Sequence, residues 1–342
     1  MALMKTLKFL LFSACLSAAT LCGADYSKEP QVAPFVDLMV NEHNFKRENI
    51  LNWLAAAKHQ TSIVKAMSRP AEKVKPWHEY RKIFVTDLRT QRGVEFWQKH
   101  AKTLQRAYKE FGVDPAIIVS ILGVETNYGR NTGSYRVVDA LSTLAFDYYT
   151  SVEKRESRRK FFTTQLEHVF LLAREQNQDP LSLKGSYAGA MGWGQFMPNS
   201  YRNYAVDYDD DGLADIWTNP TDAIGSVANY FKEHGWKKDN PVATRAHIKE
   251  GHNKEGLNKM RRPKITIAEL ETKGYQPAQN YPKDSNAFPM VLTGKYGDEY
   301  WLGLHNFYVI GRYNPRIKYA MAVYQLSLMI KEQRCELVEN CS

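Results

Sequence analysis

The chain has 342 residues, of which 44% are hydrophobic and 24% are charged, and this composition is ordinary for a globular protein. Its length exceeds what one hydrophobic core comfortably fills, so we expect two or three subdomains around a shared cleft. The net charge of +9 favours a polyanionic partner, such as an anionic lipid surface or an acidic cell-wall glycan. Nucleic acid is not expected as a partner, because the basic residues are interspersed with acidic ones and form no long run.

Residues 1–24 have the pattern of a secretory signal peptide. Lys5 and Lys8 precede an apolar stretch over residues 9–21, and small residues up to Ala24 follow it. The apolar stretch is too short to span a bilayer stably. We therefore expect cleavage near Ala24 and a soluble, exported protein.

The four cysteines fall at the two ends of the chain. A lipid anchor on Cys22 fits poorly because Leu21 precedes it, and Cys15 follows a very short apolar run, so an outer-membrane lipoprotein is the less expected form. Signal cleavage would leave Cys335 and Cys341. In an exported chain these two are expected to form a disulfide that staples the tail, and the alternative is two free thiols.

Residues 25–102 are predicted to form an N-terminal helical domain. Apolar side chains recur at helical spacing over residues 30–67, again over 80–84, and again over 93–111. A further helical pattern near the end of the chain predicts that residues 315–342 pack against this domain and complete it.

The stretch 117–128, IIVSILGVETNY, carries a single charged residue, Glu125. Pro115, directly after Asp114, is typical of a helix start with Asp114 as its cap. If the apolar run is buried, Glu125 loses water, which disfavours the charged form and raises the pKa of its carboxyl. The alternative is a glutamate at the solvent-exposed end of a surface helix.

After two further stretches of helical period, at 138–148 and 158–174, the chain becomes rich in glycine. Residues 184–201 read KGSYAGAMGWGQFMPNSY, and their glycines and alanines allow the backbone to approach another group closely. That group could be a ligand. The alternative is tight packing between helices.

Residues 207–222 resemble a calcium-binding loop of the EF-hand type, because acidic residues occupy its first, third and fifth positions and Gly212 its sixth. Position 12 is Thr218 rather than the usual glutamate, so any bidentate ligand would come from the next acidic residue. The expected ligands of a structural Ca²⁺ are Asp207, Asp209, Asp211, Leu213 and Asp222. The alternative is a solvated acidic turn.

Residues 239–314 are predicted to form a small β subdomain inserted in a helical protein. This segment is rich in Lys, Asn, Pro and Gly, and strand-like pieces occur at 264–267, 287–292 and 300–310. The fold class expected from the sequence is therefore α+β and mostly α-helical.

Five motifs in order, GVETNYG, RRKFF, GSYAGAMGWGQFMPNSY, the Asp loop with DAIGSVANYFKEHGW, and NFYVIGRYN, resemble the lytic murein transglycosylase B family. The resemblance covers the chain from about Tyr80 to the C-terminal helix. It implies a lysozyme-like catalytic core, here residues 103–238, in a periplasmic enzyme that is expected to be a monomer. Members of the family cleave the β-1,4 bond between N-acetylmuramic acid and N-acetylglucosamine of peptidoglycan without water, and membrane association is common among them.

The resemblance also implies roles for individual residues. The glutamate of the GVET motif is Glu125, which would act as a single general acid and base and yield 1,6-anhydro products without a catalytic cofactor. Ser186 and Gln195 match residues that orient the acetamido group of the substrate, and Arg158 would meet a lactyl or peptide carboxylate. Aromatic faces for sugars are expected from Tyr80, Tyr187, Phe196, Tyr230, Tyr308 and Tyr313, although core packing is an equal alternative for each.

Two other functions are compatible with these residues. A muramidase that uses water would need a second carboxylate opposite Glu125, and the motifs offer no evident candidate. A non-catalytic peptidoglycan-binding protein would keep the cleft, but it would have no use for a carboxyl with a raised pKa. The Asp loop also has one more residue before Asp222 than the family loop, which leaves open the acid that closes the calcium site.

Overall fold

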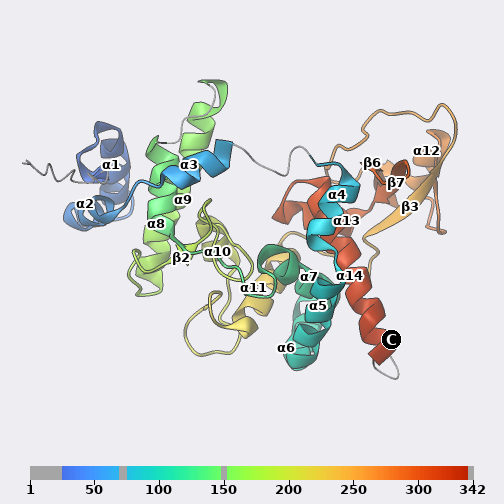
Figure 1. Ribbon diagram of the computed structural model, residues 1–342, viewed down its shortest axis with the longest axis horizontal. Helices are drawn as coiled ribbons and strands as arrows, with labels where there is room; N and C mark the ends of the chain where they lie inside the picture. Colours follow the sequence, from blue (N-terminus) through green and yellow to red (C-terminus); the bar gives the residue numbers. More distant parts are fainter. Residues whose placement is uncertain (1–24, 69–74, 148–151, 338–342) are drawn as a thin grey trace, which may run out of the picture.

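The computed structural model describes residues 25–68, 75–147 and 152–337. The molecule is elongated, with α1 and α2 at one end and strands β3, β6 and β7 at the other (Figure 1). The predicted signal peptide lies outside the described residues, as does Cys341, so the predicted disulfide stays a prediction. None of the described helices is both long enough and apolar enough to cross a membrane.

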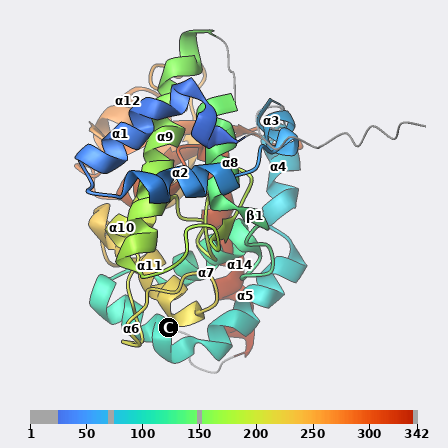
Figure 2. The ribbon, with the colours of Figure 1, turned by 90° about the vertical axis from the view of Figure 1, so that its left-hand side faces the viewer.

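The first hydrophobic core, which we call the α9 core, joins the N-terminal helices to the middle of the chain. Trp53 of α2 stacks on Phe170 of α9 at 5.1 Å between ring centroids, and Phe35 of α1 lies 6.0 Å from the same ring. Figure 2 shows α1 and α2 lying across α9. The elements of this core are η1 (Tyr26–Lys28), η2 (Pro30–Val32), α1 (Ala33–Asn41), α2 (Arg47–Ala56), α3 (Thr61–Ser68), α8 (Val137–Ser142), η4 (Thr143–Asp147, a π-helical segment), α9 (Val152–Glu175) and α10 (Pro198–Tyr204).

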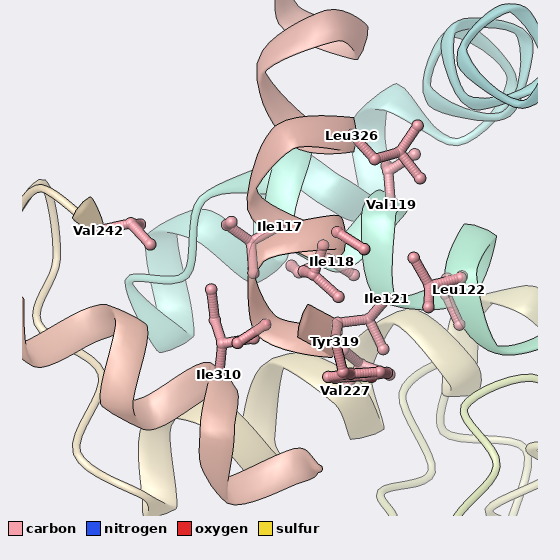
Figure 3. Packing of buried hydrophobic residues seen from close by; sticks show 14 of the residues in the cluster. Ile117, Ile118, Val119, Ile121, Leu122, Val227, Val242, Ile310, Tyr319 and Leu326 are labelled. Carbon is pink, nitrogen blue, oxygen red and sulfur yellow. The ribbon is translucent and has the colours of Figure 1, made fainter. Parts of the chain in front are cut away.

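The second core, the α7 core, is built around the apolar stretch that contains Glu125. Helix α14 packs along α7, α5 and α4, and Figure 3 shows Ile117, Ile121, Tyr319 and Leu326 in the contact between α7 and α14. The helices of this core are α4 (Trp77–Phe84), α5 (Asp87–Lys99), α6 (Ala101–Phe111), α7 (Pro115–Thr126), α11 (Pro220–Glu233), α13 (His305–Tyr313) and α14 (Ile317–Leu337).

The packing differs from the domain division expected for residues 25–102. Helices α1–α3 bury their apolar faces in the α9 core, whereas α4, α5 and the C-terminal helix α14 share the α7 core. The C-terminal helix therefore completes only the later part of the predicted N-terminal domain. Helical periodicity shows that a helix has an apolar face, but it does not show which other face covers it.

Helix α7 begins where the sequence predicts, with Asp114 as its cap. Asp114 accepts a hydrogen bond from the backbone N–H of Ala116 at 2.9 Å, and Pro115 occupies the first turn. Residues 116–124 and 126 are all buried, as expected of a helix that is apolar on every side. The helix ends at Asn127, whose φ of +53° is left-handed and whose N–H donates to the carbonyl of Gly123 at 3.0 Å.

The β subdomain contains a five-stranded antiparallel sheet in the order β4-β6-β7-β3-β5. Its elements are β3 (Ala243–Ile248), β4 (Ile265–Thr266), α12 (Ile267–Thr272), β5 (Tyr275–Pro277), β6 (Asn286–Thr293) and β7 (Asp298–Gly303). The predicted strand 300–310 is wrong in its second half, because residues 305–313 form helix α13 and bury Phe307 and Ile310, three positions apart, in the α7 core. Strand β3 was not predicted from the sequence, because most of its residues are exposed or half-buried and therefore show no apolar pattern.

A second, two-stranded sheet lies beside α7. Strands β1 (Tyr135–Arg136) and β2 (Lys184–Gly185) pair with Tyr135 opposite Gly185. This pairing brings the loop that follows α7 against the start of the glycine-rich stretch.

Candidate active site

Glu125 is half-buried in the last turn of α7. Its Oε1 atom accepts a hydrogen bond from the hydroxyl of Tyr319 at 2.5 Å. Burial raises the pKa of the Glu125 carboxyl to about 7, and the hydrogen bond from Tyr319 acts in the opposite direction because it favours the charged form. Among the described residues, no other carboxylate contributes to this shift. Glu125 therefore exchanges a proton near neutral pH.

The charge of Glu125 affects the pKa of three tyrosines. Burial raises the pKa of Tyr319 and of Tyr313 well above the usual value, and the charge of Glu125 adds to both shifts. The same two causes raise the pKa of Tyr80 to about 12. All three hydroxyls therefore remain protonated at neutral pH; that of Tyr319 donates to Glu125, whereas that of Tyr313 donates to the carbonyl of Gly194.

The backbone after Glu125 turns sharply. Asn127 and Tyr128 both have left-handed φ angles, of +53° and +61°. A tyrosine in this conformation is strained, and such strain is found preferentially at functional sites. Thr126 holds the turn, because its hydroxyl donates to the carbonyl of Trp193 at 2.9 Å and accepts from the N–H of Gly129 at 2.9 Å.

The bond from Thr126 also joins α7 to the glycine-rich stretch that carries Ser186 and Gln195. The Oγ of Ser186 accepts from the N–H of Ala190 at 3.1 Å, so its own proton is available to a ligand. The Nε2 of Gln195 donates to the carbonyls of Thr132 at 3.1 Å and Gly192 at 3.0 Å. Gln195 therefore offers its amide oxygen to a ligand as an acceptor.

Three of the predicted sugar-facing aromatic residues are core residues: Tyr80 in the α7 core, and Phe196 and Tyr230 in the α9 core. Phe196 is 3% exposed and Tyr230 is 7% exposed, and their ring centroids lie 5.7 Å apart. Both also pack against Tyr313, whose centroid lies 4.8 Å from that of Tyr230. Because their rings are covered, these two residues support Tyr313 rather than present a face to a ligand.

Tyr80 and the other predicted contact residues have varied surroundings. Tyr80, 1% exposed, borders a cavity of 420 Å³ between α4, β6 and residues 315–318. Tyr187 is 43% exposed, and Tyr308 is half-buried with its ring 6.4 Å from that of His305. Arg158 is exposed on α9 and lies over the ring of Phe162, which belongs to the α9 core. No contact in the described part of the chain joins Arg158 to Glu125, so its role stays a prediction.

The sequence did not point to Tyr319, the residue that contacts Glu125. The sequence nevertheless contains a signal for this contact, because Tyr319 lies near the start of a C-terminal helix that is predicted to pack against the rest of the protein. A buried tyrosine hydroxyl usually finds a hydrogen-bond partner, and an unpaired glutamate in another apolar helix is a suitable one.

The Asp loop brings together three carboxylates. One oxygen each of Asp207, Asp209 and Asp211 lies within 4.8 Å of the others, which suits the oxygen-rich coordination that Ca²⁺ requires. Asp222 stands outside this group: it is fully buried and accepts from the N–H groups of Tyr208 at 2.7 Å and Asp215 at 2.8 Å. Burial raises the pKa of Asp222 to about 6, and the charges of Asp209 and Asp207 also raise it. A cation in the loop would offset this repulsion.

The arrangement defines a class of enzyme. The carboxyl of Glu125 has a pKa near neutrality and a tyrosine hydroxyl as its partner, and Thr126 links its helix to a loop that offers the Ser186 hydroxyl and the Gln195 amide oxygen. Such a set of groups is suited to general acid and base catalysis on a neutral, hydroxyl-rich ligand. An enzyme of this kind acting on a glycan needs no metal at its reacting atoms.

Comparison with known proteins agrees with that class. The profile of the family described as Transglycosylase SLT domain matches residues 27–328. The membrane-bound lytic murein transglycosylase B of Escherichia coli (strain K12) is 43% identical over 323 residues, which are 92% of this chain and 86% of that protein. The chain belongs to this transglycosylase family.

Solved structures give the same result for the fold. The structure of the lytic transglycosylase SltB1 from Pseudomonas aeruginosa has 51% sequence identity and a TM-score of 0.84, covering 91% of this chain and 100% of that one. The Escherichia coli lytic transglycosylase Slt35 in complex with calcium has 42% identity and a TM-score of 0.81, covering 91% and 96%. The lysozyme-like, mostly helical α+β fold expected from the motifs is confirmed.

Proposed function

We propose that the protein is a lytic transglycosylase that cleaves the β-1,4 bond between N-acetylmuramic acid and N-acetylglucosamine in peptidoglycan, with Glu125 as the only acid and base. The observation that carries this proposal is the carboxyl of Glu125, which accepts a hydrogen bond from Tyr319 and has a pKa raised by burial to about 7, with no contribution from another carboxylate among the described residues. Family membership supports the reaction class and argues against a purely binding role.

In the first step, the protonated Glu125 carboxyl donates its proton to the glycosidic oxygen, and the bond from that oxygen to C1 of the muramic acid breaks. In the second step, the Glu125 carboxylate takes the proton of the muramic acid 6-hydroxyl while that oxygen forms a bond to C1. The product is a 1,6-anhydro sugar, and Glu125 ends in its starting protonation state. Two-carboxylate glycosidases hold their acids about 5–9.5 Å apart, whereas among the described residues no second carboxylate contributes to the pKa shift of Glu125.

Ser186 and Gln195 would orient the acetamido group beside C1. The hydroxyl of Ser186 is free to donate to the acetamido oxygen, and the amide oxygen of Gln195 can accept from the acetamido N–H. This pairing satisfies both polar ends of one amide and fixes its direction, which lowers the entropic cost of reaching the transition state. Tyr313 would complete the wall of the site, because its hydroxyl bonds the carbonyl of Gly194 in the same stretch.

The products of digestion distinguish this reaction from hydrolysis. Mass spectrometry of sacculi digested by the protein is expected to show glycan ends 18 mass units lighter than reducing ends, because no water is added. Digestion in H₂¹⁸O is expected to introduce no label into the muramic acid ends. Labelled reducing ends would instead establish a water-using muramidase.

We propose further that the Asp loop binds one structural Ca²⁺ through Asp207, Asp209, Asp211 and the carbonyl of Leu213, with Asp222 closing or bracing the site. The carboxylate cluster supports this, and the calcium complex of Slt35 supplies a precedent in a relative. The ion would order the segment between the glycine-rich stretch and α11.

Calcium is expected to raise the melting temperature of the protein. An ion that binds only the folded state at about 100 times its Kd adds about 2.7 kcal/mol, which corresponds to several degrees in a chain of this size. Melting in 1 mM Ca²⁺ and in chelator measures the difference. Asp209→Asn is expected to abolish it, and Asp284→Asn, an exposed acid outside the loop, is expected to preserve it. Equal midpoints for the unchanged protein would contradict a folded-state site.

The protein is proposed to act in the periplasm after export. The membrane-bound relative and the cell-wall substrate support this location, as does the signal pattern in the sequence.

A further inference from the structure

A second cavity, of 680 Å³, lies beside α4 and α14. It is bordered by α4, by the turn 294–297 between β6 and β7, and by α14. On α14, Tyr319 contacts Glu125, whereas Leu328 and Met329 border this cavity. At about 1.5 Å of rise per residue, Gln325 lies roughly 9 Å and Leu328 roughly 14 Å further along the helix than Tyr319. Neither Glu125 nor Tyr319 is among the residues that border the cavity, so we treat it as distinct from the active site. We call it the α4 groove.

The α4 groove carries unpaired positive charge. Lys82 and Lys295 are exposed and form no ion pair with any carboxylate in the described parts of the chain. The guanidinium of Arg81 donates to the amide oxygen of Gln325 at 2.6 Å and likewise has no acidic partner there. Of the groove's remaining charges, Arg245 pairs with Glu299 at 3.2 Å, and Asp298 adds one exposed carboxylate. The four Lys and Arg residues that border the groove therefore exceed its two carboxylates by two.

The groove also has features of a binding surface rather than of a solvated basic face. Tyr296 is 91% exposed at the tip of the turn, and Leu328 is 44% exposed on the opposite wall. The indole N–H groups of Trp77 and Trp301, which border the groove, are buried and have no hydrogen-bond partner among the described residues. Buried donors of this kind are uncommon and call for an explanation. A cavity of this size is in the range that holds a small organic ligand.

We propose that the α4 groove is a second binding site for the acidic peptide stems of peptidoglycan, separate from the site that cleaves the glycan. The inference rests on the proposed function in that it takes peptidoglycan as the substrate. Carboxylates of the stem match Arg81, Lys82 and Lys295, whereas neutral sugar hydroxyls do not need three cations. The apolar wall at Leu328 and Met329 suits the small side chains of a peptide. The groove would hold a peptide-bearing strand while another segment lies at Glu125.

Binding is measured in a Glu125→Gln background, so that the strand stays intact. The test variant Lys82→Glu/Lys295→Glu reverses two exposed groove charges. The control variant Lys102→Glu/Lys109→Glu makes the same change in net charge on the exposed face of α6, away from the groove. The probes are soluble peptidoglycan strands with intact stems and the same strands after an amidase has removed the stems, and calorimetry gives the Kd of each.

The test variant is expected to bind stem-bearing strands about tenfold more weakly than the control variant, and to bind stem-free strands equally well. Equal loss for both probes, or no loss relative to the control, would overturn the proposal. Binding of both variants to vesicles that contain anionic lipid is measured as well. If the test variant binds these vesicles more weakly but binds both kinds of strand as the control does, the groove is a membrane contact and the proposal is wrong. Because Glu125→Gln does not turn over, this result is independent of which products the active protein forms.

Discussion

The substitution Glu125→Gln is expected to lower kcat/KM on peptidoglycan by at least about 10³-fold, since general acid and base catalysis contributes about 10²–10⁴-fold and here one residue supplies both steps. Glutamine keeps the size of the side chain and can still accept the hydrogen bond from Tyr319, so folding and strand binding are expected to be unchanged. Turnover of sacculi and co-sedimentation with them measure the two effects separately. Glu42→Gln, an exposed residue of the same type, is the control.

The same carboxyl sets the pH dependence of the wild-type rate. The first step needs the protonated form, and the pKa of Glu125 is raised to about 7, so kcat/KM is expected to be retained below pH 7 and to fall as the pH rises through that value. An active Glu125→Gln variant, or a wild-type rate that rises steadily from pH 6 to pH 9, would show that another residue is the acid.

Gly133→Ala is expected to cost about 10²-fold in activity, because it would separate the two loops that form the site. A Cβ atom at Gly133 would lie 2.2 Å from the carbonyl oxygen of Gly185 and 2.5 Å from the backbone nitrogen of Ser186. These are backbone atoms that cannot rotate away, so β1 and β2 must move apart and carry Ser186 with them. A shift of about 1 Å at a reacting site is sufficient for a loss of this size.

Gly251→Ala is the matched control for that substitution. Both glycines have left-handed φ angles, of +93° for Gly133 and +73° for Gly251, but a Cβ at Gly251 meets nothing within 4 Å. The control therefore carries the backbone strain, about 1–2 kcal/mol of stability, without the collision. Melting curves and kcat/KM of both variants test this. Wild-type activity in Gly133→Ala would mean that the spacing of these loops does not matter to the reaction.

The sequence predicted the features that depend on neighbours along the chain. Asp114 and Pro115 define the start of α7 through local capping, and the apolar run before Glu125 is long enough to indicate that the helix is buried. The alternating acids of the Asp loop likewise predict a cluster of carboxylates, because their spacing alone brings them together. The raised pKa of Glu125 follows from the same burial.

The sequence could not predict partners that are distant along the chain. Tyr319 lies 194 positions from Glu125, and its hydroxyl is the donor that holds the carboxyl. Phe196 and Tyr230 have the aromatic character of sugar-binding residues, and only the packing around Tyr313 shows that their rings are covered. Residues 305–313 contain Val and Ile that favour strands locally, but burial against α14 makes them helical.

The active site lies where the α7 core meets the α9 core. Glu125 and Tyr319 belong to elements of the α7 core, whereas Met191, between Ser186 and Gln195, and Phe196, directly after Gln195, are buried in the α9 core. Proton transfer and substrate orientation are thus supported by two separately packed bodies, linked by the bond from Thr126 to Trp193. A change in the packing of either core therefore moves the acid relative to the substrate-orienting groups, so residues remote from the reacting atoms can affect the reaction through this alignment.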